Sequence, residues 1–83
     1  MTYILFNRKH GSENNILGVY SSHDKAMDAI NNFLNYNKVP AINIRHYEPN
    51  EWDYTRINRR DGTKTRWTLT LNVYEMDFDL YGV

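Results

Sequence analysis

The sequence predicts an α+β fold, in which a single helix packs on a mostly antiparallel sheet and the elements follow the order β-β-α-β-β-β. Two observations predict this class. One amphipathic stretch with helical spacing is flanked on both sides by short apolar or alternating segments that are typical of strands. The dipeptide Asp61-Gly62 lies between two of the later segments and is a strong hairpin signal. A chain of 83 residues has room for one domain, so we assign residues 1–83 to a single domain.

The first two strands are expected on either side of a polar loop. Residues 2–7 contain the apolar and aromatic run Tyr3-Ile4-Leu5-Phe6, a composition that favours a strand. Residues 8–15 are polar and contain a glycine, so they predict a loop. Residues 16–20 are again apolar and predict the second strand of a hairpin.

The helix is expected directly after the second strand. Ser21-Ser22-His23-Asp24 resembles a capping box, because an acidic residue follows Ser21 by three positions. The apolar residues that follow recur at helical spacing: Ala26, Met27, Ile30, Phe33 and Leu34. Residues 35–37 tolerate a left-handed C-terminal cap, and Pro40 prevents the helix from continuing.

Three strands are expected after the helix. Residues 41–47 predict the third, and residues 51–58 and 63–74 predict the two arms of a hairpin around Asp61-Gly62. In the last strand, Trp67 and the alternate residues after it are apolar, but this alternation slips by one position near residues 73–75. Such a slip requires a bulge, a bend or a strand break there.

The composition argues against catalysis, so we expect no enzyme, no catalytic residue, no cofactor and no metal site. The chain has no cysteine, which excludes a thiol nucleophile and a disulfide framework and favours a reducing compartment. Its serines lie in a loop and at the helix cap, and its three histidines lie in separate elements. No apolar run is long enough to cross a membrane, and the first residues lack the basic region of a signal peptide.

Basic residues gather around the predicted hairpin turn, and aromatic residues lie close to them in the sequence. The basic residues are Arg56, Arg59, Arg60, Lys64 and Arg66, and the aromatic residues are Trp52, Tyr54 and Trp67. Arginines interleaved with aromatic rings can hold phosphates and stack on bases. The same cations could instead bind an acidic protein, or pair with acidic residues of this chain such as Glu51 and Asp53. The net charge of zero weakens non-specific attraction to nucleic acid.

Three acidic residues, Glu75, Asp77 and Asp79, alternate near the end of the chain. In an extended segment they would all point to one side. They form either a solvated face that protects a sheet edge, or a contact surface for a basic partner, or a site for a divalent cation.

The run Leu17-Gly18-Val19-Tyr20-Ser21-Ser22 with Lys25-Ala26, together with the later Tyr74-Glu75-Met76-Asp77, resembles a template found in small bacteriophage-encoded proteins. The high asparagine content is similar to that of early proteins of T-even-type phages. This resemblance implies an accessory protein that binds and blocks a host enzyme, such as a polymerase, a defence nuclease or a toxin ribonuclease, in the host cytoplasm. Residues 48–65, which carry Trp52, Arg56, Arg59 and Arg60, depart from the template.

Two functions are therefore expected. The first is a non-enzymatic inhibitor of a host protein, which contacts its partner through the five basic residues and through Glu75, Asp77 and Asp79. The alternative is an RNA- or single-strand-binding module that uses Trp52, Tyr54, Arg59, Arg60 and Trp67. The strand over residues 67–74 could lie on a sheet edge, in which case edge pairing would produce a homodimer.

Overall fold

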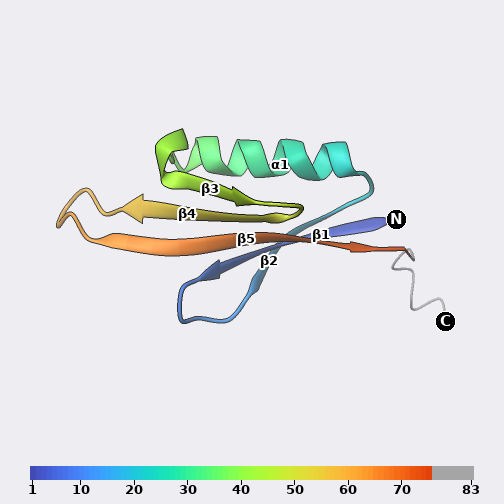
Figure 1. The fold of residues 1–83 in the computed structure, drawn as a ribbon, viewed down its shortest axis with the longest axis horizontal. Helices are drawn as coiled ribbons and strands as arrows, with labels where there is room; N and C mark the ends of the chain where they lie inside the picture. Colours follow the sequence, from blue (N-terminus) through green and yellow to red (C-terminus); the bar gives the residue numbers. More distant parts are fainter. Residues whose placement is uncertain (76–83) are drawn as a thin grey trace.

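The computed structural model describes residues 1–75 and contains one helix and a five-stranded antiparallel sheet (Figure 1). The α+β class and the order of strands and helix along the chain are confirmed. The elements are β1 (Thr2–Lys9), β2 (Asn15–Tyr20), α1 (His23–Tyr36), the short 3-10 helix η1 (Ala41–Asn43), β3 (Ile44–Tyr47), β4 (Glu51–Ile57) and β5 (Lys64–Tyr74).

The sheet has the order β2-β1-β5-β4-β3, so the last strand of the chain is its central strand. β5 pairs with β1 on one side and with β4 on the other, with Leu71 opposite Leu5 and Leu69 opposite Trp52. The prediction that the strand over residues 67–74 lies on an edge is therefore wrong. The two edge strands are β2 and β3. β5 has β1 on one side and β4 on the other, so neither of its sides is free.

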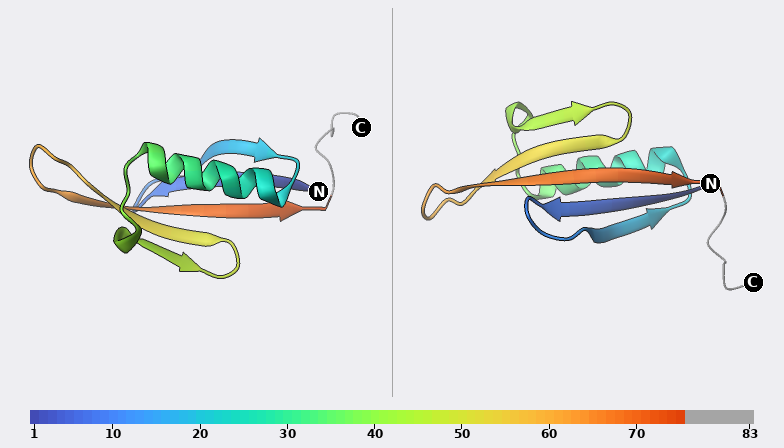
Figure 2. Two further views of the ribbon diagram at one scale, coloured as in Figure 1. Left: turned by 90° about the horizontal axis from the view of Figure 1, so that it is seen from above. Right: turned by 60° about the horizontal axis from the view of Figure 1, so that its bottom comes forward.

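The helix α1 covers one face of the sheet, and within residues 1–75 no second helix covers the other face, which is called the open face below (Figure 2). The helix contributes Ala26, Ile30 and Leu34 to the core, and the sheet contributes alternate residues such as Leu5 and Leu71. Side chains alternate between the two faces of a strand, so the residues between these positions lie on the open face. The core thus occupies a single layer between helix and sheet.

The N-terminus of α1 is capped by Ser22, whose Oγ accepts a hydrogen bond from the Lys25 backbone N–H at 3.2 Å. The helix begins one residue later than the predicted capping box requires, since that box pairs Ser21 with Asp24. The residue at the third helical position is Lys25 and not an acid, so the reciprocal bond of a full box has no acceptor.

The C-terminus of α1 ends in a Schellman motif. The Val39 N–H donates to the Leu34 carbonyl and the Lys38 N–H donates to the Asn35 carbonyl, each at 3.0 Å. Lys38 adopts a positive φ of 54°, the left-handed conformation that this motif requires at its last turn. The sequence predicted this conformation at one of residues 35–37. In the structure it lies at the next residue, Lys38, because α1 ends at Tyr36 and Asn37 is its C-cap.

Two other segments differ from the prediction. Residues 41–43 form a 3-10 turn and not a strand, because the Asn43 N–H donates to the Pro40 carbonyl at 2.8 Å, and Ile42 is left 91% exposed. The slip in alternation near residues 73–75 coincides with the end of β5 at Tyr74. The sheet's bulge lies elsewhere, between β1 and β2.

Candidate functional site

The β4–β5 hairpin carries its loop past the C-terminal end of α1, so the tip of the hairpin is not covered by the helix (Figures 1 and 2). The connecting loop spans residues 58–63 and is held by bonds within itself. The Asn58 side-chain oxygen accepts from the Arg60 N–H, and Asp61 Oδ1 accepts from both the N–H and the hydroxyl of Thr63. Gly62 has a φ of 73°, as its place in the predicted turn requires. The loop therefore presents Arg59 and Arg60 from an ordered backbone.

A groove of about 760 Å³ lies between this hairpin and the end of α1. Four of the described residues that line it are cations, and none is an acid. The cations are Lys9 from β1, Lys38 from the end of the helix, and Arg56 and Arg59 from the hairpin. Like charges in one concave site focus a positive potential, which attracts anions.

Three carbonyls near the C-terminus of α1 accept capping hydrogen bonds, which reduces the partial negative charge that free carbonyls at such an end present. The Asn37 side-chain amide donates to the Phe33 carbonyl at 2.8 Å, and the backbone N–H groups of Lys38 and Val39 occupy the next two carbonyls.

Two aromatic rings also line the groove. Tyr36, the last residue of α1, is 86% exposed, and Trp67 on β5 is half-buried. Trp67 lies parallel to Tyr54, with ring centroids 6.3 Å apart and an interplanar angle of 14°. Trp67 is therefore a fixed ring, whereas Tyr36 stands at the end of the helix with most of its surface in solvent.

Tyr54 holds Trp67 in place from within the core. Its hydroxyl donates to the buried Asn7 Oδ1 at 2.9 Å, and Phe33 contacts its ring edge-on with centroids 6.1 Å apart. Burial raises the pKa of the Tyr54 phenol to about 12, because the ionised form would lose its hydration. Trp67, which lines the groove, thus rests on a buried and hydrogen-bonded part of the core.

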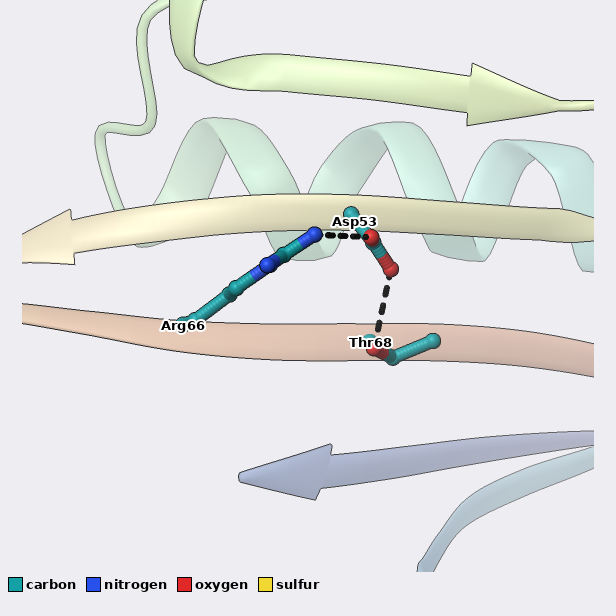
Figure 3. A network of polar contacts seen from close by, with 3 residues as sticks. All are labelled: Asp53, Arg66 and Thr68. Atoms are coloured by element: carbon teal, nitrogen blue, oxygen red, sulfur yellow. Dashed lines mark hydrogen bonds and ion pairs between the residues drawn. The ribbon is translucent and has the colours of Figure 1, made fainter. Parts of the chain in front are cut away.

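The structure divides the five basic residues predicted to act together. Arg56 and Arg59 line the groove, and Arg60 lies exposed in the loop. Arg66 lies on the opposite face of the sheet, where its guanidinium contacts Asp53 Oδ2 at 3.1 Å, and Thr68 donates to the other oxygen of that carboxylate (Figure 3). Lys64 is two residues from Arg66 along β5 and shares this open face.

Apart from Arg66, these basic residues make no ion pair with another residue in the part of the chain described. The predicted pairing of the basic cluster with acids of its own hairpin is therefore limited to Arg66 and Asp53. The remaining four cations, Arg56, Arg59, Arg60 and Lys64, are exposed and available to a partner.

Two of the predicted stacking residues lie inside the protein. Trp52 is 6% exposed and Tyr54 is 1% exposed, because alternate positions of β4 face the helix. Trp52 stacks on His46, with ring centroids 4.6 Å apart. Neither ring can stack on a base without unfolding the core, so only Trp67 of the three predicted aromatics is left at the groove.

The predicted acidic surface is only partly described. Glu75 is exposed just after the end of β5, whereas Asp77 and Asp79 lie outside the described residues.

Sequence reasoning missed three residues of the groove: Lys9, Tyr36 and Lys38. The alternation of β1, continued to Lys9, places this residue on the same face as Leu5. The residue opposite Lys9 in the sheet is Trp67, which lies 58 positions away, so the sequence gives no sign that the two meet. Tyr36 and Lys38 come to the groove because the helix ends there, and no local pattern links that end to the hairpin.

A separate apolar surface lies on the open face of the sheet. Ile16 and Val19 of the edge strand β2 are 62% and 57% exposed, and they lie opposite Phe6 and Ile4 in register. This strip is on the face away from α1, so it is distinct from the groove.

Within residues 1–75, no helix has the length and apolar character needed to cross a membrane. The same part of the chain contains no group of three or more His, Cys, Asp or Glu placed to hold a metal ion. No protein-family model, no curated protein and no solved structure matches this chain.

Proposed function

We propose that this protein acts by binding and not by catalysis, and that its ligand is a nucleic acid whose phosphates contact the basic end of the β4–β5 hairpin. The observation that carries this proposal is the groove itself, where four cations and two aromatic rings converge and the described lining contains no carboxylate. Phosphate contacts from Lys and Arg supply most of the affinity of non-specific nucleic-acid binding. The exposed Arg60 in the loop extends the same basic surface beyond the groove.

Arginine suits this role because its planar fork can form two hydrogen bonds to one phosphate. The loop that carries Arg59 and Arg60 is held by Asn58 and Asp61, so little backbone order has to be gained on binding. The zero net charge of the chain does not oppose this, because the local field in the groove depends on the nearby cations more than on distant acids.

The test is a binding titration with short labelled RNA and DNA oligonucleotides at a series of salt concentrations. For four neutralised phosphates, the logarithm of the association constant should fall with the logarithm of salt with a slope of about −3. The double variant Arg59→Glu plus Arg60→Glu should bind about tenfold more weakly or worse.

The matched control is Arg8→Glu plus Arg45→Glu, which changes the net charge by the same amount. Arg8 and Arg45 lie in one row across the open face of the sheet, away from the groove. This control should bind within about twofold of the wild type. Equal binding by wild type and the Arg59/Arg60 variant would reject the proposal.

Binding and inhibition of a host protein, the function that the phage resemblance implies, stays a second proposal. The observation that favours it is the apolar strip around Ile16 and Val19, since exposed apolar patches on small proteins commonly mark protein contacts. A pull-down from bacterial lysate treated with ribonuclease tests it. The proposal is supported if the wild type captures a stoichiometric partner and Ile16→Glu does not. If Ile16→Glu captures the partner equally well, the strip is not the contact surface.

A further inference from the structure

We infer that the groove between α1 and the β4–β5 hairpin binds an unpaired base together with its flanking phosphates, so that the protein selects single-stranded over double-stranded nucleic acid. This inference rests on the proposed nucleic-acid binding and assigns the part of the ligand that enters the site. Bases in a duplex are stacked on one another, so a duplex can offer the groove its phosphates but not the face of a base.

The positions of the two rings support this inference. Tyr36 comes from the end of the helix and Trp67 from the sheet, and both line the same groove. Tyr36 is 86% exposed and is not part of the core cluster, so the fold does not explain an aromatic residue there. A base that entered between these two elements could stack on either ring.

The packing of Trp67 holds its ring in place before any ligand binds. Its ring lies parallel to Tyr54, which is fixed in turn by the hydrogen bond to Asn7. A ring that is ordered before binding loses little conformational freedom when a base stacks on it, so more of the stacking free energy appears as affinity.

The placement of the cations also supports the inference. Lys9 and Lys38 reach the groove from the body of the domain, and Arg56 and Arg59 reach it from the hairpin. β1 and β4 flank β5, so Lys9 and Arg56 lie on opposite sides of Trp67, as a strand that passes over this ring requires. The volume of about 760 Å³ lies within the range of about 300–1,000 Å³ that is typical of small-ligand sites.

The residue at position 38 also supports the inference. The left-handed conformation at the end of a Schellman motif is usually taken by glycine, but here a lysine takes it, with a φ of 54°. Residues that break a local preference in this way are concentrated at functional sites. Lys38 supplies a cation to the groove from a position where stability alone would favour glycine.

The experiment compares one labelled single strand with the duplex of the same sequence, using the full chain and the variants Tyr36→Ala and Tyr36→Phe. Tyr36→Ala should weaken single-strand binding by about five- to a hundredfold and leave duplex binding unchanged. Tyr36→Phe should bind like the wild type, because stacking needs the ring and not the hydroxyl. Circular dichroism should show intact folding of both variants, since Tyr36 is exposed and alanine favours the helix.

The matched control is Tyr47→Ala, which removes a partly exposed tyrosine from β3 at 39% exposure, outside the groove. It should leave both affinities unchanged. An unlabelled polyglutamate chain should compete much more weakly than an unlabelled single strand of equal charge. Competition of equal strength would identify an acidic peptide as the better ligand and overturn the inference.

The outcomes separate this inference from the proposed function. If neither the strand nor the duplex binds, nucleic-acid binding itself is rejected. If both bind equally well and Tyr36→Ala binds like the wild type, nucleic-acid binding stands, and the assignment of the groove to an unpaired base is overturned.

Discussion

Lys38 is the residue at which the demands of stability and of the proposed function are opposed. Its left-handed backbone is disfavoured for any residue with a Cβ by about 1 kcal/mol. We therefore predict that Lys38→Gly raises the free energy of unfolding by about 0.5–1 kcal/mol and weakens nucleic-acid binding. Urea denaturation and a binding titration on the same samples measure the two effects.

Lys38→Ala is the control for that prediction, because it removes the charge but keeps a Cβ in the strained position. It should lose affinity like Lys38→Gly and gain no stability. A stability gain with alanine as large as that with glycine would show that the backbone at residue 38 is not the source of the effect.

The buried pair of Tyr54 and Asn7 makes a second prediction at the residue scale. Tyr54→Phe keeps the ring but leaves Asn7 Oδ1 buried without its donor, since the Tyr54 hydroxyl is the partner of that oxygen. The free energy of unfolding should fall by about 1–3 kcal/mol. Chemical denaturation near neutral pH measures this loss, and a variant as stable as the wild type would show that the hydrogen bond contributes nothing.

The same phenol predicts a loss of stability in alkali. Its pKa rises from 10.0 in the unfolded chain to about 12 in the fold, so the folded state holds its proton more tightly. The resulting stabilisation is complete below pH 10 and is lost as the pH rises through about 12, by about 2–3 kcal/mol in total. The denaturation midpoint of the wild type should fall over that window, and the Tyr54→Phe variant should lack this part of the fall.

The hairpin loop is the element that positions the proposed contact residues, and Asp61 is its main internal anchor. Hydrogen bonds from the hydroxyl and backbone N–H of Thr63 hold the pKa of the Asp61 carboxyl below its usual value of 3.8. A depressed pKa stabilises the folded loop above pH 3.8, and this contribution disappears as the pH falls through the folded value. The protection of the Thr63 amide, measured as its exchange rate relative to that of the unfolded chain at the same pH, should therefore fall in acid. An Asp61→Ala variant should show this low protection already at neutral pH, and unchanged protection there would contradict the assigned role.

The sequence predicted the elements well because each one has a local cause. Alternation in β5, helical spacing in α1 and the Asp61-Gly62 turn are all properties of neighbouring residues. The order of strands in the sheet has no such cause, because β1 pairs with β5 across most of the chain. This is why the sequence left open an edge position for β5, and why Lys9 could not be linked to Trp67.

At the scale of the whole molecule, the sheet separates residues that the sequence places side by side. Arg56 and Arg66 both flank the hairpin loop, and each lies opposite a threonine on the neighbouring strand. Arg56 lines the groove under the helix side of the sheet, and Arg66 pairs with Asp53 on the open face (Figure 3). Arg56 and Arg66 are close in the sequence of the hairpin and were therefore grouped as one cluster. Because side chains alternate along a strand, the two arginines lie on opposite faces of the sheet.

This separation makes a prediction that uses the same substitution at both sites. Arg56→Ala should weaken single-strand binding by about three- to tenfold and lower the salt dependence by nearly one phosphate contact. Arg66→Ala removes the same charge from the same hairpin but should change the affinity by less than about twofold, because its guanidinium is held by Asp53 on the other face. Equal losses would mean that the ligand wraps around both faces of the hairpin. In that case the whole basic tip, and not the groove beside the helix, would be the surface that recognises the strand.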